Sequence, residues 1–424
     1  MMDYKNPPDM MDLLVHASPS SDFNLVLLLP EDVIFAILDF LLWKDFQSFD
    51  SSLTSHKSRP RWNHLKDSFL RNWKRVITCE RVLENYISDG DALITLADGR
   101  IAASGLVHNV KLWNATTGTC EKLLIGHRGT PNVFIQLNDG RLATGSWDST
   151  IKIWDISTGV CDFTLAYHSF EVISLLQLHD GRLVSGSYDC TMRIWNIKTG
   201  ARELRLTGHG GPVCCLLQLH DGRLASASYD GSIKIWDVES GRCDHTFRAI
   251  QATSRGGGVL IQLMDGRIAS GTPANTIKIW NVRNAVCELT LAGHCRNICS
   301  LIVLKDGRVA SGSWDRTIKI WNVTDGVCEQ TIEGQKNIPP RLLFPLQNGR
   351  LISSSYHNTG HDQKKGGDSS EHDSTIRVWN LVDGQCELTL AGHVQRVHGL
   401  VELRDGRIAS ASDDYTMRIW NIKG

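Results

Sequence analysis

The sequence lacks an excess of charge of either sign. Lys and Arg together number 45 and Asp and Glu 46, which gives a formal net charge of −1. A protein that holds a nucleic-acid backbone electrostatically usually carries a clear basic excess. The charge balance therefore argues against nucleic acid as the main partner.

A long uninterrupted apolar run and a basic-then-apolar leader are also missing. Residues 1–23 are polar, and the most apolar stretch, residues 25–42, contains Pro30, Glu31, Asp32 and Asp39, which a membrane span would not tolerate. Without a signal peptide, the 12 cysteines are expected to be reduced thiols. We expect a soluble protein of the cytoplasm or nucleus with no membrane association.

Aromatic residues are few, yet 13 Trp stand against 7 Tyr. Eight of these Trp end an apolar pattern such as Ile-Lys-Ile-Trp, with gaps of 41, 41, 41, 44, 41, 58 and 41 residues: Trp113, Trp154, Trp195, Trp236, Trp280, Trp321, Trp379 and Trp420. A second marker, Asp-Gly-Arg, runs in step from residues 98, 139, 180, 221, 265, 306 and 405, with Asn348-Gly349-Arg350 as the eighth. Two independent markers with one period indicate an internal repeat.

Each repeat is predicted to form four short strands. In the second repeat these are residues 131–136, 141–146, 150–154 and 161–165, with a hairpin turn at Asp139-Gly140. No segment of the repeats has a sustained 3.6-residue apolar period, so no helix is expected there. Four-stranded units bury both faces when they are arranged radially. We therefore predict an all-β, closed eight-bladed β-propeller.

The motifs of the repeat resemble the WD-repeat family. Gly126-His127, Thr144-Gly145-Ser146-Trp147-Asp148 and Trp154-Asp155 match its signature, and the resemblance spans roughly residues 77–424. It implies a non-enzymatic fold that presents a flat face to other macromolecules. It also implies buried structural hydrogen-bond chains, two of which would be His127, Thr144, Asp148 and Trp154, and His209, Ser226, Asp230 and Trp236.

The eighth repeat ends after its third strand, and a segment near the start of the chain is predicted to supply its fourth. Cys79-Glu80-Arg81-Val82-Leu83 matches Cys386-Glu387-Leu388-Thr389-Leu390, and each Cys lies 19 residues before the Asp of an Asp-Gly-Arg turn. Residues 76–83 are therefore predicted to complete blade eight and close the ring. Their deletion would leave two unpaired edges and reduce cooperative folding.

Three blades depart from the buried chain. Blade one has Tyr86 in place of the His and Val107 in place of the Asp; blade five has Ala274 in place of the Asp and no His; blade seven has Gln335 in place of the His. We expect these blades to be locally less stable.

No catalytic residue, cofactor or metal is predicted. Seven cysteines share one position in the outer strand and are predicted to be packing residues: Cys79, Cys120, Cys161, Cys243, Cys287, Cys328 and Cys386. Cys295 and Cys299 lack a second pair, which argues against zinc. The histidines of the insertion at 356–372 could bind a metal, but a solvated loop is the favoured interpretation.

Function is expected where the chain departs from its repeat. The insertions at 248–258 and 356–372 fall on the face where partners of WD propellers usually dock. In related propellers the residue before the turn Asp points to this top face near the channel. The partner-binding positions predicted there and in nearby segments are Trp147, Tyr188, Tyr229, Trp314, Ile173, Cys214, Cys299, His398, Arg128 and Arg296.

Aromatic and apolar side chains dominate this set, so we predict a protein partner held without a phosphate. Two alternatives stay open. The aromatic side chains could merely cover the blade ends, and the arginines could select an acidic ligand.

Residues 25–58 are predicted to form a helical segment, with Pro30, Glu31 and Asp32 in its first turn. The register resembles the F-box. The resemblance implies docking on a Skp-type adaptor of a cullin–RING ubiquitin ligase through Leu29, Pro30, Val33, Ile34, Ile37, Leu38, Leu41 and Phe46. A helical cap packed on the propeller is the alternative. Residues 59–76 are predicted to be a helical linker and residues 1–24 to be disordered.

The leading hypothesis is thus an F-box/WD-repeat substrate receptor of an SCF-type ubiquitin ligase, which would act by proximity and perform no chemistry. The alternative is a WD-repeat scaffold with no role in ubiquitin transfer, and adaptor binding separates the two. A third hypothesis, an enzyme that uses the loop histidines, has no further support in the sequence.

Overall fold

The computed structural model describes residues 76–77, 79–83, 92–248, 260–272, 274–333, 339–355 and 374–422. The predicted N-terminal segments at 1–24 and 25–58 lie outside these residues, as does the predicted helical linker at 59–76 except for Val76, which is in a strand. Tyr86, Gln335 and the insertion at 356–372 also lie outside them.

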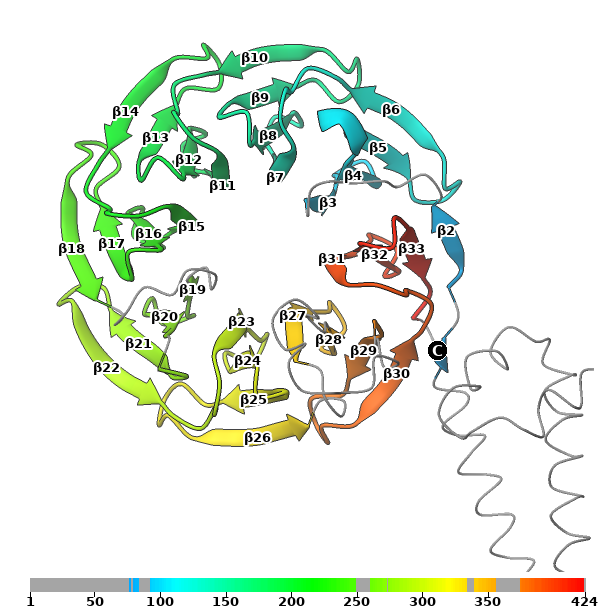
Figure 1. Ribbon diagram of the computed structural model, residues 1–424. Coiled ribbons are helices and arrows are strands. Elements are labelled where there is room, and N and C mark those ends of the chain that lie inside the picture. The colour runs from blue at the N-terminus through cyan, green and yellow to red at the C-terminus, as the bar shows by residue number, and fades with distance from the viewer. Residues whose placement is uncertain are drawn as a thin grey trace, which may run out of the picture. The chain divides into compact units, whose positions relative to one another are not determined.

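Within the described residues the strands form eight sheets arranged around a channel (Figure 1), and each sheet runs from the channel to the rim. The innermost strands are β3 Leu93–Thr95, β7 Pro131–Gln136, β11 Val172–Gln177, β15 Val213–Gln218, β19 Leu260–Gln262, β23 Ile298–Val303, β27 Pro340–Pro345 and β31 Val397–Glu402. The second strands are β4 Arg100–Ser104, β8 Leu142–Ser146, β12 Leu183–Ser187, β16 Leu224–Ser228, β20 Ile268–Gly271, β24 Val309–Ser313, β28 Leu351–Ser355 and β32 Ile408–Ser412.

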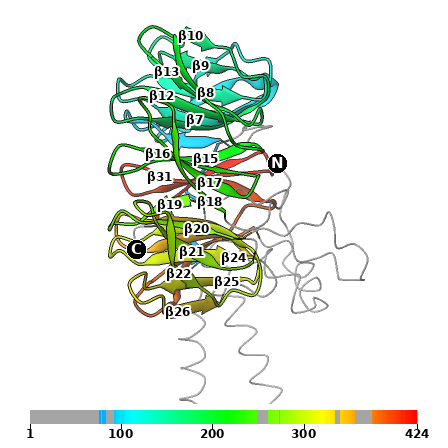
Figure 2. The same ribbon diagram turned by 90° about the vertical axis from the view of Figure 1, so that its left-hand side faces the viewer.

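The third strands are β5 Val110–Asn114, β9 Ile151–Trp154, β13 Met192–Trp195, β17 Ser232–Trp236, β21 Ile277–Asn281, β25 Thr317–Trp321, β29 Ile376–Trp379 and β33 Met417–Trp420. The rim strands are β6 Cys120–Leu124, β10 Cys161–Leu165, β14 Arg202–Leu206, β18 Cys243–Arg248, β22 Val286–Leu291, β26 Cys328–Glu333, β30 Cys386–Leu390 and, for blade eight, β2 Arg81–Leu83. Edge-on, rim strands β10 and β26 lie at opposite ends of the ring (Figure 2). This architecture is the predicted eight-bladed propeller.

The composition of each strand follows from its neighbours. In blade two, β8 is buried along its whole length, because sheets pack against both of its faces, and its residues are correspondingly small. In β9, Ile151 and Ile153 are buried and Lys152 between them is half-buried. This alternation is expected of a strand that has one face more buried than the other. At the turn between β7 and β8, Gly140 has a φ of 90°, a conformation that other residues rarely adopt.

The hydrophobic core lies between the blades, in eight separate clusters. Each cluster combines side chains of one blade with the Trp of the following blade. Trp154 packs with Leu112 and Leu142 in the cluster of blade one and two, and Trp236 packs with Val184 and Ile194 of blade three. At the seam, Trp113 of blade one packs with Met417 and Ile419 of blade eight.

The ring is closed by β2, which pairs antiparallel with β33 so that Leu83 lies opposite Met417. The prediction for residues 76–83 is therefore correct for residues 81–83. It is wrong for β1, Val76–Ile77, which pairs in parallel with β30 and forms a fifth strand of blade seven. The chain reaches β2 by passing the rim of blade seven, where the outer edge of β30 offers unpaired backbone groups.

Two blades that lack the turn Asp close that turn by other means. In blade one the turn contains η1, Leu106–His108, a single 3₁₀ turn in which exposed Val107 has a φ of 57°. In blade five the hydroxyls of Thr272 and Thr276 lie 2.8 Å apart across the turn that contains Ala274. No α-helix occurs among the described residues of the repeats, as predicted.

Neighbouring residues of the closing strand β2 are predicted to contribute very differently to the free energy of unfolding. Leu83 is fully buried at the seam and Val82 beside it is exposed. Leu83→Ala should lower the free energy of unfolding by about 2–4 kcal/mol, because it removes core contacts and leaves a cavity. Val82→Ala should change it by about 0.5 kcal/mol or less. Equilibrium urea unfolding measures both values, and equal effects would contradict the closure by β2.

Candidate functional site

A hydrogen-bond chain links the top loop, the second strand and the third strand of a blade. In blade two, Trp154 Nε1 donates to Thr144 Oγ1 at 2.8 Å, and His127 Nε2 lies 2.8 Å from the same hydroxyl. His127 Nδ1 then lies 2.8 Å from Asp148 Oδ2. In blade four the corresponding distances among Trp236, Ser226, His209 and Asp230 are 2.8, 2.7 and 3.1 Å.

Within the described residues the chain is complete in three further blades, with the members His168, Ser185, Asp189 and Trp195; His294, Ser311, Asp315 and Trp321; and His393, Ser410, Asp414 and Trp420. The structure thus brings together both sets of network residues named from the sequence.

The direction of the chain follows from its two ends. A Trp indole can only donate, and a carboxylate can only accept. In the neutral imidazole whose Nδ1–H donates to the Asp, Nε2 accepts a hydrogen bond from the Ser or Thr hydroxyl. Burial lowers the pKa of His168, His209, His294 and His393. Burial alone would raise the pKa of Asp148, but hydrogen bonds from His127 and Thr150 hold it well below its usual value.

A Ser, a His and an Asp in hydrogen-bond contact resemble a nucleophilic triad, but the geometry here is structural. The Ser226 hydroxyl is fully buried and holds the Trp236 indole on one side and His209 on the other. No substrate atom can reach it. The same arrangement in blade after blade fixes the top turn to the sheet.

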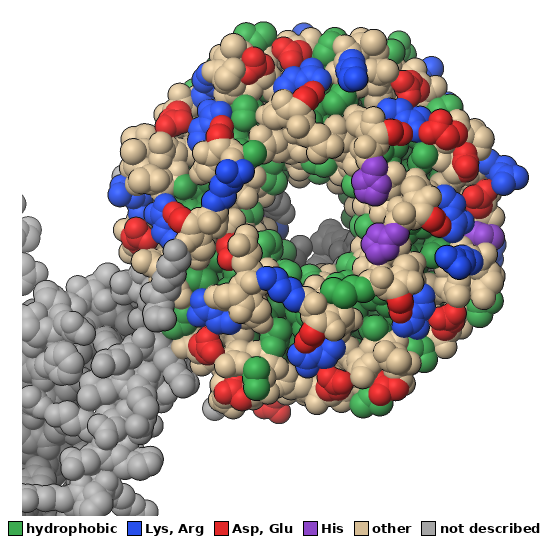
Figure 3. Space-filling view, turned by 180° about the vertical axis from the view of Figure 1, so that it is seen from behind, with side chains coloured by type: hydrophobic (Ala, Val, Ile, Leu, Met, Phe, Trp, Pro, Cys, Tyr) green, Lys and Arg blue, Asp and Glu red, His purple; other side chains and the backbone are tan. Residues whose placement is uncertain are grey.

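On the face that carries the Asp-Gly-Arg turns, the charges of the arginines are balanced by acidic side chains of the same turns. Arg141 donates two hydrogen bonds to Asp139, at 3.0 and 2.7 Å. It also donates to the Ile197 carbonyl of the next blade at 2.9 Å. Acidic and basic side chains are therefore interspersed around this face (Figure 3).

The same inter-blade contact recurs from Arg100, Arg182, Arg223, Arg267 and Arg350. These arginines hold adjacent blades together and do not form an open basic ring. The Asp or Asn partner within each turn was predicted from the sequence, whereas the bond to the next blade was not.

The opposite face exposes aromatic side chains on blades two to four. Trp147 is 55% exposed, Tyr188 43% and Phe170 59%. Tyr188 and Tyr229 meet edge to face, with ring centroids 6.1 Å apart. Burial, followed by the proximity of Tyr188 and Cys214, raises the pKa of Tyr229 to about 12. We call Trp147, Phe170, Tyr188 and Tyr229 the aromatic surface.

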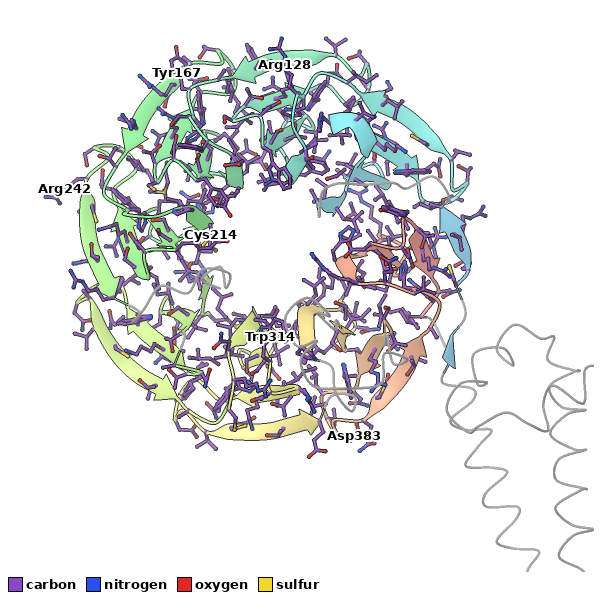
Figure 4. The ribbon with its side chains drawn as sticks, in the orientation of Figure 1. Arg128, Tyr167, Cys214, Arg242, Trp314 and Asp383 are labelled. Atoms are coloured by element: carbon purple, nitrogen blue, oxygen red, sulfur yellow. The ribbon has the colours of Figure 1, made fainter. Side chains whose placement is uncertain are left out.

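The other positions proposed from the sequence do not join this surface. Trp314 lies on blade six, at the channel side of the ring and apart from Cys214 on blade four (Figure 4). The thiols of Cys214 and Cys299 face backbone carbonyls, of Ala227 at 3.4 Å and of Pro340 at 3.0 Å.

The four remaining positions differ in exposure. His398 is nearly buried and lies 3.9 Å from Asp413, and Ile173 is half-buried. Arg128 and Arg296 are exposed in the top loops of blades two and six. The partner-binding positions predicted from the sequence therefore lie on several separate blades and do not form one surface.

Phe170 and Tyr167 were missed by the sequence analysis. Both are exposed in the loop that enters blade three, and Tyr167 occupies the place of the Gly in Gly126-His127. A comparison of aligned repeats at that position could have found it.

Other kinds of site are limited in the described part of the chain. There, no three His, Cys, Asp or Glu side chains are placed to share a metal ion, and no helix combines the length and apolarity needed to cross a membrane. The 12 cysteines, all of them described, are free thiols.

Comparison with known proteins agrees with this geometry. The family model "WD domain, G-beta repeat" matches residues 118–155, 159–196, 200–237, 285–322 and 384–421. The chain is 46% identical over 57 residues to the nuclear distribution protein PAC1-2 of Uncinocarpus reesii, which covers 13% of this chain and 12% of that protein. It is 41% identical over 56 residues to Lissencephaly-1 homolog 1 of Paramecium tetraurelia, which covers 13% and 14%.

The chain thus matches about one eighth of the length of these relatives. Among solved structures, the computationally designed protein Ika8 matches with a TM-score of 0.67 and 24% identity, over 82% of this chain and all of that one. This likeness concerns the fold alone.

The hydrogen-bond chain predicts unequal costs for one substitution in two blades. Ser226→Ala leaves Trp236 Nε1 and His209 Nε2 without their hydrogen-bond partner, whereas Ser270→Ala in blade five leaves only Trp280 Nε1. Each buried polar group left unpaired costs about 1–3 kcal/mol. Ser226→Ala should therefore be more destabilising than Ser270→Ala by at least about 1 kcal/mol in urea unfolding. Equal costs would show that the His contributes nothing.

The same chain predicts a loss of stability on acidification. An unfolded His has a pKa of about 6.5, and burial holds the pKa of His168, His209, His294 and His393 lower. The unfolded state therefore binds more protons as the pH falls through about 6.5, so stability present above that pH is lost. The Asp partners, whose pKa values are also lowered, add to this loss below about pH 4.

Urea unfolding at pH 7.5 and pH 5.5 should show this fall, of up to about 1.4 kcal/mol per pH unit for each buried His. His168→Gln should make the dependence shallower, whereas His179→Gln, on an exposed turn, should leave it unchanged. Stability that rises from pH 7.5 to 5.5 would contradict the account.

Proposed function

We propose that this chain, a propeller of WD40 repeats, is a platform that binds other proteins through the aromatic surface of blades two to four. The observation that carries the proposal is the contrast between the two faces. On one face, the charged side chains of the Asp-Gly-Arg turns are bound to each other and to the next blade. On the other, Trp147, Phe170 and Tyr188 are open to solvent.

Exposed Trp and Tyr side chains are the residues that most often dominate the binding free energy of protein interfaces. They offer a large apolar area with little conformational entropy to lose. Tyr188 is further held by its contact with Tyr229, so the surface is partly ordered before a partner arrives. This supports binding through aromatic contacts without a phosphate at the channel side of the top face.

A second candidate is the substrate receptor of a cullin–RING ubiquitin ligase, in which residues 29–46 would dock on a Skp-type adaptor. It rests on the F-box resemblance of that segment, which lies outside the described residues. The two relatives are named for nuclear distribution and for Lissencephaly-1. Neither name refers to ubiquitin transfer, and both are compatible with the platform.

The platform is tested by a double variant with a matched control. Proteins that co-purify with the full chain should be identified, and one of them should be purified for a direct titration. Trp147→Ala with Tyr188→Ala should weaken that binding by about 30-fold or more, as expected for two interface anchors. Met264→Ala, at an exposed side chain beside an Asp-Gly-Arg turn, should leave it unchanged. Equal binding by the two variants would exclude the aromatic surface.

Adaptor binding separates the two candidates. The full chain should be co-expressed with a Skp-type adaptor, together with an Ile37→Asp, Leu38→Asp double variant whose propeller is checked by circular dichroism. The platform hypothesis predicts no adaptor in the purified complex. Stoichiometric adaptor that the double variant loses would favour the substrate receptor.

A further inference from the structure

Blade three departs from its repeat at three positions, and a fourth carries an Arg that only blades seven and eight share (Arg377 and Arg418). Tyr167 replaces the Gly that precedes the network His in four other blades. Arg193 takes the place of Lys152, and Arg205 the place of Thr164, both of blade two. Arg202 replaces the outer-strand Cys. Three of these four side chains are arginines, although the chain as a whole has no basic excess.

These four side chains meet at one place on the rim. Arg193 and Arg205 lie directly opposite each other on β13 and β14, and Arg202 lies opposite Trp195. The Arg202 guanidinium lies 4.6 Å from the centre of the Tyr167 ring, and that ring lies 6.1 Å from the ring of Trp195. Figure 4 places Tyr167 at the outer side of blade three.

The usual pairing at this position is neutral. Lys152 Nζ donates to Thr164 Oγ1 at 2.8 Å in blade two, and Lys234 donates to Thr246 at 2.9 Å in blade four. Blade six repeats the contact between Lys319 and Thr331. In blade three the acceptor hydroxyl is replaced by a second guanidinium, and like charges directly opposite each other across two strands are destabilising.

The surrounding carboxylates do not compensate for this charge. Asp189 Oδ2 lies 3.8 Å from Arg193 Nη2, but it already contacts His168 and the Ser169 amide. Among the described residues, Arg202 and Arg205 are exposed and form no ion pair. If the negative charge of Asp189 offsets the positive charge of Arg193, the charges of Arg202 and Arg205 remain uncompensated.

Arg193 lies beneath the two exposed arginines. It is only 5% exposed, and its Nη1 has no hydrogen-bond partner among the described residues. Burial lowers its pKa, Asp189 opposes this, and the charges of Arg205 and Arg202 lower it further. A buried guanidinium with a free donor, below two exposed ones, is an arrangement that an anion would stabilise.

We propose that Tyr167, Arg193, Arg202 and Arg205 form a binding site on the rim of blade three for the phosphate group of a phosphorylated side chain on a protein partner. A phosphate monoester carries a charge of about −1.5 to −2 at neutral pH, which matches the two uncompensated positive charges. Guanidinium groups bind such an anion with paired hydrogen bonds. The stacking of Arg202 on Tyr167 orients one of these groups in advance.

The neighbouring rim strands favour a protein over a membrane as the source of the phosphate. An anionic membrane attracts an extended basic surface. Here the basic cluster is confined to one blade. The rim strands of blades two to four also carry acidic side chains, Asp162 on β10, Glu203 on β14 and Asp244 on β18, which pair with Arg141, Arg182 and Arg242. The site is separate from the aromatic surface, so an experiment can refute one of the two proposals without affecting the other.

A titration of the full chain tests the proposal at low ionic strength. The probes are a phosphoserine peptide flanked by Gly and Ser, its unphosphorylated form, and inorganic phosphate. The parent should bind the phosphorylated peptide at least about tenfold more tightly than the unphosphorylated one. Arg205→Thr, which introduces the residue found at this position in five other blades, should weaken that binding at least about tenfold. Arg242→Gln, an exposed rim arginine of blade four (Figure 4) paired with Asp244, should not.

Thermal unfolding provides a second readout that does not depend on the peptide. Without ligand, Arg205→Thr should melt at a higher temperature than the parent, because it removes the like-charge pair. Inorganic phosphate should raise the melting temperature of the parent and not that of Arg205→Thr.

Equal binding of the phosphorylated peptide by the parent and Arg205→Thr would overturn the proposal, as would a parent that does not distinguish the two peptides. Binding to vesicles that contain phosphatidylinositol phosphate in preference to the peptide would overturn the assignment to a protein partner.

Discussion

The Trp that ends each third strand is shared between two blades. Its indole ring packs in the cluster of the preceding blade, while in blades two to eight its Nε1 donates to a hydroxyl of its own blade. A blade therefore lacks part of its core unless its neighbour is in place, and the ring has no natural end. This explains why β2 is needed at the seam, where Trp113 packs against blade eight.

The repetition of this contact separates structure from function. Where His, Ser, Asp and Trp recur together, they fix the top turn and carry no chemistry. Side chains that break the pattern are free to differ, since the ring does not depend on them. The aromatic surface and the arginine cluster of blade three are both departures of this kind.

The sequence was sufficient for the fold because the Trp spacing and the Asp-Gly-Arg turns mark every blade. It predicted the buried chain from His127 and His209, and the closing role of residues 81–83. It could not predict β1, since Val76 and Ile77 carry no repeat motif and pair only because the edge of β30 is open. Nor could it predict the orientation of Cys214 and Cys299, whose thiols face carbonyls.

The arginine cluster can be found by comparing aligned repeats, whereas a search for motifs does not detect it. Arg193 lies in the third-strand pattern that ends in Trp195, whereas Arg202 and Arg205 lie in the rim strand, and the register of β13 and β14 brings them together. The proposed adaptor contacts differ in kind, because Ile37 and Leu38 lie in a segment that the structure does not describe.

The sharing of each Trp between neighbours is tested most directly by hydrogen exchange of Trp236→Phe. Trp236 belongs to blade four but packs in the cluster of blade three. The account predicts faster amide exchange in β12, β13 and β17, with β20 and β21 of blade five unchanged. Exchange that accelerates as much in blade five as in blade three would contradict it.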